Sequence, residues 1–341
     1  MRTVSAVLVF LVLAATPAVQ AQLSYTTNAD GITLTITGYS GTPSVGPLNI
    51  PSNIYGLTVV NIGNGAFAGP SDGLGTVIEM YPTSVTIPNT ITNIGGGAFF
   101  SCAGLTNITI PDTVLSIGEN AFLNSGLLNI IIPDSVTNIG DWAFWNCYLT
   151  NATIGNGVTS IGRGVFGKNN MTGVTIPGSV TNIGVQAFMY CFDLKNVTMG
   201  NSVTNIADQA FYDCISLIAI YFEGNAPSLG SSVFSYDPNL TFYYLPGTTG
   251  WASLAQLTGA PTVFWNPSIQ SSNPNFGVKN NVFGFTITCT NNIPIVVAAT
   301  TNLAGGAWTP LQTLTLTNGS VYFGDPQWTN YPCRFYGLSF P

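Results

Sequence analysis

The hydrophobic residues of this chain recur with a long, regular period. A Phe returns after every 22 or 23 residues, at Phe99, Phe122, Phe144, Phe166, Phe188, Phe211 and Phe234. At fixed offsets from this column lie apolar triplets of the form L-x-x-Φ-x-Φ, such as Leu127, Ile130 and Ile132. The last two members alternate with polar residues and precede a Pro or Gly, which predicts a short strand with one inward face. The pattern therefore predicts a mainly β solenoid of stacked turns.

Each turn also carries a second inward pair, such as Val136 with Ile139, followed by a Gly and an Ala-Phe or Val-Phe dipeptide. Stacked inward side chains would form a continuous apolar core, so no single turn is expected to fold alone. The period breaks once, in a 32-residue step from Phe67 to Phe99. We expect an insertion around Gly69 to Tyr81, either a bulged loop or a degenerate turn.

The repeat consensus, IPxSVTNIGxxAFxxCxxLTNVTI, is most complete from Ile132 to Leu149 and from Ile176 to Met199. It resembles the BspA-like leucine-rich repeat family over approximately residues 44 to 246. The resemblance implies a leucine-rich-repeat solenoid. It also implies a secreted or surface-exposed interaction protein, often proposed to act in adhesion, without enzymatic activity.

The N-terminal residues have the pattern of an export signal. Arg2 precedes an apolar stretch from Val4 to Ala15, and small residues end at Ala21. This predicts a signal peptide, residues 1–21, cleaved before Gln22. A membrane anchor is the alternative, but the stretch is shorter than the ~20 residues of a spanning helix. We expect a secreted or cell-surface protein with no membrane insertion after cleavage.

The remaining boundaries follow from changes in pattern. We assign residues 22–246 to the solenoid with N-terminal lead-in strands, and residues 247–267 to an aromatic C-terminal cap. We expect Trp251 and Trp265 to pack in the core of this cap. The alternative is that they are exposed and stack on sugars. Residues 268–276 are expected to be a polar linker. Residues 277–341 alternate and contain Asn318-Gly319, a hairpin signal, which predicts a small β-sandwich-like module of about five strands. This region resembles a C-terminal module of various secreted bacterial proteins, and its function is not indicated.

Charge is scarce along the whole chain. Six Lys and Arg residues stand against 13 Asp and Glu residues, and only 6% of residues are charged. Such a surface has no basic patch for phosphates, which argues against nucleic acid as a partner. It equally disfavours binding to anionic membranes. Neutral polar ligands or other proteins fit better.

Four of the six cysteines share one position in the repeat, three residues after the column Phe. They are Cys102, Cys147, Cys191 and Cys214, and Ser125 and Asn169 fill the same position in other turns. This favours a small buried side chain that satisfies a turn. Two disulfides remain alternatives in an exported protein, Cys191 with Cys214 in adjacent turns ~4.8 Å apart and Cys289 with Cys333. With no His and no C-x-x-C pair, we predict no zinc or other metal site.

The absence of His also removes Ser-His-Asp triads and His acid–base chemistry. Two pairs of carboxylates share columns in adjacent turns, Glu119 with Asp141 and Asp112 with Asp134. Such stacking approaches the ~5 Å spacing of a retaining glycosidase, and could also hold calcium weakly. However, the first column continues with Val185 and Asp208 on an expected solvated edge. We therefore favour tolerated surface charges and predict neither an enzyme nor a cofactor.

The outward positions of the predicted strands are rich in uncharged polar residues. We select them as the candidate binding face: Asn107, Thr109, Asn129, Ile131, Asn151, Thr153, Thr175, Asn196, Thr198 and Tyr221. A flat, hydrogen-bonding sheet is where a solenoid usually presents its binding surface. β-propensity and ladder hydrogen bonding could also explain these residues on their own.

Three functions compete on this evidence. A protein-binding or adhesive scaffold agrees best with the repeat family and the export signal. Binding of neutral polysaccharide is the alternative, favoured by the uncharged face and by nearby aromatics such as Phe100, Trp145 and Tyr212. An ice-binding surface is suggested only by the column of outward Thr residues on successive turns. This column is interrupted and lacks the regular pairs of Thr that such a surface would need. The predicted partner is an extracellular protein or a neutral glycan, and no oligomeric state is indicated.

Overall fold

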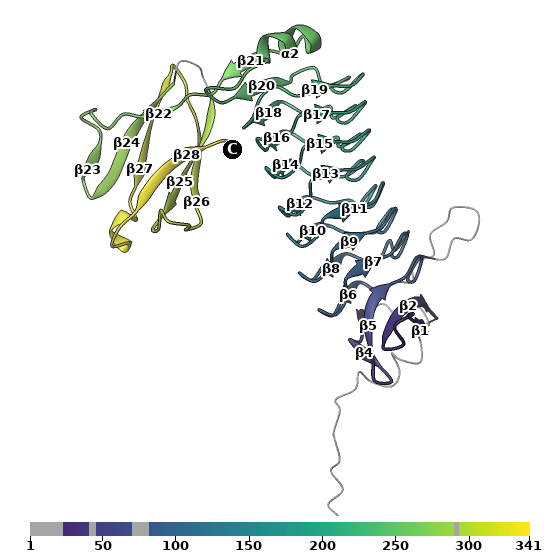
Figure 1. Cartoon of the computed structure of the whole chain (residues 1–341). Coiled ribbons are helices and arrows are strands. Elements are labelled where there is room, and N and C mark those ends of the chain that lie inside the picture. Colours follow the sequence, from purple (N-terminus) through teal and green to yellow (C-terminus); the bar gives the residue numbers. More distant parts are fainter. Residues whose placement is uncertain (1–22, 41–45, 70–81, 290–292) are drawn as a thin grey trace, which may run out of the picture. The chain divides into compact units, whose positions relative to one another are not determined.

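The computed structural model describes residues 23–40, 46–69, 82–289 and 293–341 (Figure 1). The predicted signal peptide lies outside these residues. The chain forms two compact units, Met1–Val158 with Gly162–Asn169, and Thr159–Ile161 with Asn170–Pro341. Both consist largely of short strands stacked at one-turn intervals, which confirms the predicted mainly β solenoid.

The first unit begins with an antiparallel pair, β1 (Leu23–Thr27) and β2 (Thr33–Tyr39). Strand β2 then starts a parallel file that continues through β5 (Leu57–Ile62), β7 (Asn93–Ile94), β9 (Ser116–Ile117) and β11 (Asn138–Ile139), with β4 (Asn53–Ile54) beside β5. We call the strands that contain the last residues of each apolar triplet the triplet strands. In this unit, parallel pairing joins β3 (Pro47–Asn49), β6 (Ser84–Thr86) and β8 (Asn107–Thr109). It separately joins β10 (Asn129–Ile132) and β12 (Asn151–Ile154).

The second unit repeats both kinds of file. Its triplet strands are β14 (Gly173–Ile176), β16 (Asn196–Met199), β18 (Ala219–Phe222), β20 (Thr241–Tyr244) and β21 (Thr262–Phe264). Its short strands are β13 (Ser160–Ile161), β15 (Asn182–Ile183), β17 (Asn205–Ile206) and β19 (Ser228–Leu229). All neighbours within a file are parallel, so each outward residue lies beside its equivalent one turn away. We call the outward positions of the triplet strands the strand face, and those of the short strands the second face.

The Phe column forms the centre of the core in each unit. In the first unit the rings of Phe67, Phe99, Phe122 and Phe144 stack with successive centroids 5.2 Å apart and nearly parallel planes. In the second, Phe188 and Phe211 lie 5.1 Å apart. Because Phe67 stacks directly on Phe99, the 32-residue step makes one turn of the array, as expected of a loop insertion. Residues 70–81 lie outside the described part.

The Gly before the Ala-Phe dipeptide is required by close stacking. A Cβ on Gly140 would overlap the backbone nitrogen of Glu119 in the preceding turn, and one on Gly118 would overlap that of Gly96. The Gly140 amide also donates to the carbonyl of Ile117 at 2.8 Å. A Cβ at either of these two glycines would require the neighbouring turns to shift, whereas the equivalent Ala207 keeps the same bond, from its amide to the Ile183 carbonyl at 2.8 Å.

The cap after the last repeat contains a helix, α2 (Trp251–Thr258), between Gly250 and Gly259 in left-handed conformations. Trp251 is buried, stacks on Tyr244 with centroids 4.9 Å apart, and donates from Nε1 to Thr248 Oγ1 at 2.8 Å. Trp265, which we expected in the same cap core, instead packs in the core of the following module, where its Nε1 donates to the Pro294 carbonyl.

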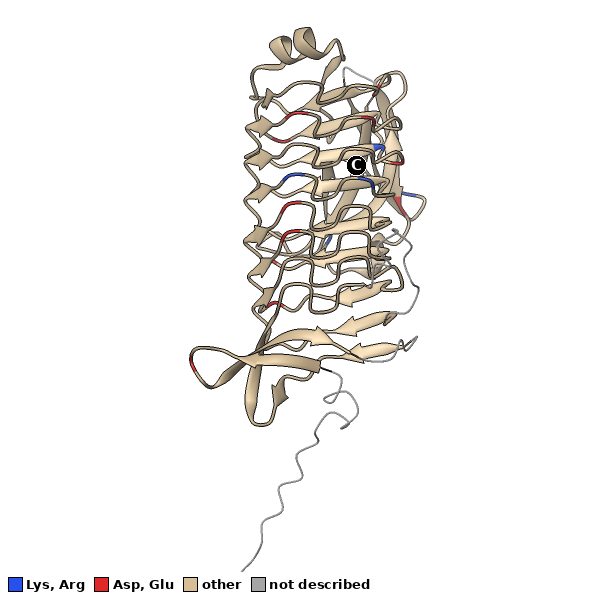
Figure 2. Cartoon of the chain, turned by 90° about the vertical axis from the view of Figure 1, so that its right-hand side faces the viewer, with Lys and Arg blue, Asp and Glu red and all other residues tan. Residues whose placement is uncertain are grey.

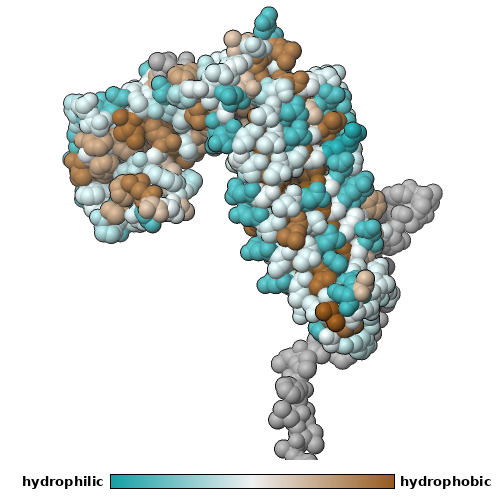
Figure 3. Space-filling view, in the orientation of Figure 1, coloured by the Kyte–Doolittle hydropathy of each residue, from teal (hydrophilic) through white to brown (hydrophobic). Residues whose placement is uncertain are grey.

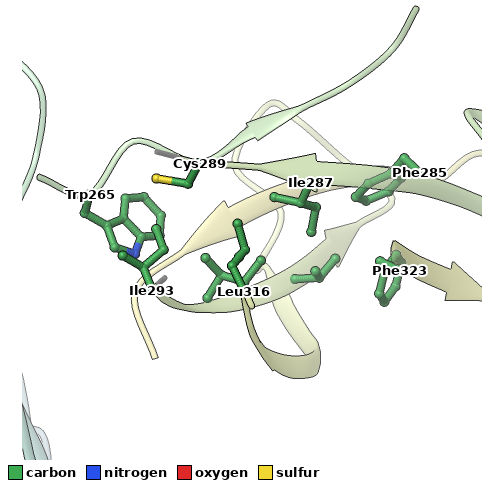
Figure 4. Packing of buried hydrophobic residues seen from close by; sticks show 9 residues of the cluster. Trp265, Phe285, Ile287, Cys289, Ile293, Leu316 and Phe323 are labelled. Carbon is green, nitrogen blue, oxygen red and sulfur yellow. The ribbon is translucent and has the colours of Figure 1, made fainter. Parts of the chain in front are cut away.

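The C-terminal module comprises two antiparallel sheets. One contains β22 (Ser268–Ile269), β23 (Gly277–Lys279), β24 (Val282–Thr288) and β27 (Ser320–Asp325), and the other β25 (Pro294–Thr300), β26 (Thr309–Thr315) and β28 (Phe335–Ser339). A short 3-10 helix, η1 (Trp328–Asn330), precedes β28. The apolar side chains between the sheets include Trp265, Ile293 and Leu316 (Figure 4).

Two details of this module differ from the sequence predictions. Ser268 and Ile269, placed in a linker, pair with Thr288 and Ile287 in the first sheet. The Asn318-Gly319 turn has the expected positive φ angles, 59° and 76°. The turn closes a single antiparallel bridge between Thr317 and Ser320, but the strands beyond this bridge, β26 and β27, belong to different sheets.

Candidate binding faces of the solenoid

The strand face of the first unit is exposed and polar. In β10 and β12, Asn129 lies beside Asn151 and Ile131 beside Thr153. All four side chains are exposed, as are Asn107 and Thr109 in β8, while the intervening residues point into the core. Ile131 is 67% exposed, so this face contains an apolar side chain among amides and hydroxyls.

The strand face of the second unit loses exposure toward its C-terminal end. Thr175 is exposed, Asn196 and Thr198 are half-buried, and Ala219 and Tyr221 are buried. The expectation that Tyr221 is an exposed position was therefore wrong: the side chain is 2% exposed. Its ring contacts those of Tyr243 and Phe340, each with a centroid distance of 5.0 Å. The repeat pattern could not predict this burial, because Phe340 lies outside the repeats.

The second face is a site that our sequence reasoning missed. Its outward file contains Asn and Ser side chains that bond to one another along the stack. Asn205 donates to Asn182 Oδ1 at 2.6 Å, and Ser228 donates to Asn205 Oδ1 at 3.0 Å. In the first unit Ser116 donates to Asn93 Oδ1 at 2.5 Å. The recurring Thr-Asn-Ile tripeptide, as at 137–139 and 204–206, was the available signal. Because these groups satisfy one another, the file mainly stabilises the stacking.

The stacked carboxylates have structural partners. One oxygen of Asp141 accepts a hydrogen bond from the Arg163 backbone at 2.9 Å, and one of Asp134 accepts from the Asn156 backbone at 2.7 Å. Asp208 accepts from the Ser231 backbone at 2.7 Å. Each carboxylate thus binds the backbone one turn further along. Charged residues are sparse among the described turns in Figure 2. No group of three or more His, Cys, Asp or Glu residues in the described part could hold a metal ion.

The position three residues after the column Phe, here called Phe+3, is a file of buried hydrogen-bond donors. Sγ of Cys102 donates to the Phe67 carbonyl at 3.0 Å, and Sγ of Cys147 to that of Phe122 at 2.9 Å. Nδ2 of Asn169 likewise donates a hydrogen bond to the Phe144 carbonyl at 2.8 Å. Burial raises the pKa of Cys102 and of Cys147 to about 12, so both thiols stay neutral and poorly nucleophilic at neutral pH.

Neither candidate disulfide is present. Cys191 and Cys214 are both buried thiols, and Sγ of Cys214 donates to the Phe188 carbonyl at 3.2 Å, in the same way as Cys102 and Cys147 donate to Phe67 and Phe122. Cys289 is buried after β24 in one sheet, whereas Cys333 is exposed before β28 in the other. The thiol of Cys333 donates to the Thr301 carbonyl at 3.5 Å. The alternative of a disulfide between these two cysteines is therefore not what the structure shows, since each is a free thiol.

Asp237 occupies the Phe+3 position after Phe234. It is 8% exposed, and neither carboxyl oxygen has a partner within hydrogen-bonding geometry. Burial raises the pKa of Asp237 to about 7; the negative charge of Asp213 adds to the rise, and the nearby Cys214 backbone opposes it. A protonated Asp237 would be a donor, as are the Cys and Asn side chains of this file.

The turns of the second unit carry a ladder of tyrosines. Tyr190, Tyr212 and Tyr236 meet edge to face, with centroids 6.1 Å and 5.2 Å apart, and Tyr236 is 66% exposed. A pocket of about 440 Å³ lies beside helix α2, lined by Ser231, Ser232, Ser235, Leu257 and their neighbours, with no titratable side chain in its lining. It therefore offers hydrogen bonds and apolar contact without acid–base chemistry.

Hydrophilic residues follow the visible turns of the solenoid, and hydrophobic residues gather on part of the C-terminal module (Figure 3). Within the described residues, no helix combines the length and apolar character needed to cross a bilayer.

Several solved structures are similar to this chain. The Treponema pallidum leucine-rich repeat protein TpLRR is 26% identical, with a TM-score of 0.46, over 71% of this chain and 96% of that one. The pneumococcal vaccine antigen PcpA is 15% identical, with a TM-score of 0.44, over 72% and 97%. A leucine-rich cell surface protein from Faecalibacterium prausnitzii is 21% identical, with a TM-score of 0.31, over 72% and 93%. No curated protein matches the chain.

The family assignment rests on the repeats themselves. The family model of the BspA type leucine-rich repeat region matches this chain in six copies, over residues 79–192 and 159–250. Together these ranges span half of the chain. The matched residues contain the Phe column from Phe99 onward, the triplet strands and the Phe+3 file described above. The chain therefore belongs to the BspA-type leucine-rich repeat family.

Proposed function

We propose that this protein is a non-enzymatic scaffold, secreted or held at the cell surface, that binds an extracellular protein through its strand face. The observation that carries the proposal is the exposed, uncharged face of the first unit, where Asn129, Ile131, Asn151 and Thr153 lie side by side in register. The membership of a leucine-rich repeat family supports a protein-binding role.

The physical character of this face suits specific recognition. Its backbone is fixed by parallel pairing and by the stacked core beneath, so little conformational freedom is lost on binding. Asn side chains supply both donors and acceptors, and the exposed Ile131 supplies apolar contact. With few charges nearby, association gains little from electrostatic steering and should depend weakly on salt.

The side chains that could perform chemistry support the non-enzymatic part of the proposal. The Phe+3 thiols of Cys102 and Cys147 are buried and donate to backbone carbonyls. The carboxylates of Asp134 and Asp141 bind the next turn. These groups are used in holding the solenoid together, which argues against a catalytic arrangement.

Binding of neutral polysaccharide is the second candidate function. The specific observation in its favour is the tyrosine ladder of Tyr190, Tyr212 and Tyr236, which places aromatic rings and hydroxyl groups on successive turns. Such side chains have an apolar body and a polar tip, and both can contact a sugar ring.

The test is a binding screen of residues 22–341 against extracellular protein fractions and a panel of neutral glycans. The variant Asn129→Lys with Thr153→Lys places two charges on the strand face. A matched control, Thr92→Lys with Thr137→Lys, places the same charges at exposed positions immediately before β7 and β11, away from the strand face in sequence and in the same unit.

A protein ligand that binds the control and not the strand-face variant supports the proposal. Equal binding of a protein by both folded variants contradicts the assignment of the strand face. A glycan ligand that is lost on Tyr212→Ala with Tyr236→Ala would favour the second function instead.

A further inference from the structure

The strand face of the second unit ends in an aromatic group. In the outward file, Thr175 and Thr198 are followed by Tyr221 and Tyr243, which lie side by side across β18 and β20. The rings of Tyr221 and Tyr243 stack with centroids 5.0 Å apart. The other outward residue of β18 is Ala219, which is buried and lacks a polar side chain, so the outward side of this strand carries no Asn or Thr.

This aromatic group is occupied by another part of the chain. The Phe340 ring contacts Tyr221 at 5.0 Å and Trp265 at 4.5 Å, which places it between the solenoid strand and the C-terminal module. Oγ1 of Thr198 donates to the Pro341 carbonyl at 3.5 Å. One side chain and one backbone carbonyl are thus recognised together on the strand face.

Residues 340 and 341 follow β28 and lie beyond its sheet pairing. The register of β25 with β28 ends at Val296 and Ser339. The described hydrogen bonds of this segment are the long one from Thr198 to Pro341 and a local one from Ser339 Oγ to the Phe340 carbonyl at 3.1 Å. Side-chain packing therefore holds the segment in place, and short segments held in this way open readily.

We propose that Tyr221, with Tyr243 stacked beside it, and Trp265 form a subsite that accepts an aromatic side chain of an extended protein segment, and that Phe340–Pro341 occupies this subsite until such a partner displaces it. The proposal rests on the strand-face function above and names the partner class and the regulation of that face. An aromatic ring that packs beside a hydrogen-bonded backbone oxygen suits a polypeptide segment better than a glycan. The absence of charge among Thr198, Tyr221 and Tyr243 favours a neutral segment.

The first measurement is the chemical accessibility of Tyr221. Tyrosine nitration with peptide mapping compares the full chain with Phe340→Ala and with a matched control, Phe335→Ala, which removes an exposed ring from β28. We expect Tyr221 nitration to become at least about fivefold faster in Phe340→Ala and to stay unchanged in the control. Because Phe340 also packs against the module core, a Phe340→Leu variant and thermal unfolding of all variants separate exposure of Tyr221 from loss of the module fold.

The second measurement uses a labelled peptide with the sequence of residues 335–341 and its counterpart with Ala at the sixth position. We expect the first peptide to bind the Phe340→Ala protein at least about tenfold more tightly than the unaltered protein, because the subsite is then vacant. The alanine peptide should bind neither protein.

Unchanged nitration of Tyr221 in a folded Phe340→Ala protein would overturn the proposal, as would equal binding of the two peptides or equal affinity for the two proteins. Neither readout uses an extracellular ligand. Failure of the binding screen under the proposed function would therefore leave these results intact, and the two failures can be distinguished.

Discussion

The strand faces of the two units are built from the same turn and differ in what covers them. In the first unit the outward positions Asn129 and Thr153 are exposed. In the second unit the equivalent positions Ala219 and Tyr221 are buried, and Phe340 lies on Tyr221. The repeat thus determines the direction of a side chain, whereas its exposure depends on residues far away in sequence. The core beneath the two faces should be equivalent, and this expectation can be tested first.

The largest effect is expected from truncating the Phe column. Phe144→Ala in the first unit and Phe211→Ala in the second should each lower the free energy of unfolding by about 3 to 5 kcal/mol. Both rings are completely buried and stack between two neighbours of the column. Chemical denaturation followed by circular dichroism measures the loss. A loss below about 1 kcal/mol at either position would show that this ring is not part of the core.

The next prediction addresses the difference between the faces. Ala219→Lys should lower the free energy of unfolding by about 2 to 3 kcal/mol, because it places a charge at a buried position without a partner. Asn129→Lys, at the equivalent exposed position, should change it by less than about 0.5 kcal/mol. The same denaturation assay compares the two. If both substitutions are neutral, the second strand face is open in solution and the contrast between the units fails.

Asp237 tests whether the last Phe+3 position, like the others, requires a buried hydrogen-bond donor. Asp237→Asn should raise the free energy of unfolding by about 2 kcal/mol near pH 8 and change it little near pH 4. Asn169 already shows how an amide fits this file, by donating to the carbonyls of Phe144 and Phe166. Thermal unfolding across this pH range provides the measurement.

The sign follows from the direction of the pKa shift. The pKa of the buried Asp237 carboxyl is about 7 and its ordinary value is 3.8. The folded chain therefore binds this proton more tightly than the unfolded chain does. Stability contributed by the protonated carboxyl is complete below about pH 4 and is lost as pH rises through about 7. A pH dependence that persists unchanged in Asp237→Asn would assign it to other groups.

The sequence was sufficient to predict the features that depend on neighbours one turn away. The Phe column, the triplet strands and the buried Phe+3 file recur in every complete turn, so their partners are their own repeats. The features it did not predict depend on distant residues. Tyr221 is buried by Phe340, Trp265 joins a core formed by later strands, and Ser268 pairs with Thr288. No local pattern encodes these contacts, because each joins residues that lie outside the repeat period.

The smallest expected effect concerns the thiols, and it returns to the equivalence of the units. Cys147→Ser in the first unit and Cys214→Ser in the second should each cost about 1 kcal/mol or less, because Ser125 already fills the same position and a hydroxyl can donate to the same carbonyl. A disulfide between Cys191 and Cys214 would break this symmetry, since its loss would cost about 2 to 5 kcal/mol in the second unit alone. Denaturation without reductant measures both losses. Equal, small losses would support a hydrogen bond from this position to the Phe column in both units. A large loss confined to Cys214→Ser would instead show that Cys191 and Cys214 form a disulfide.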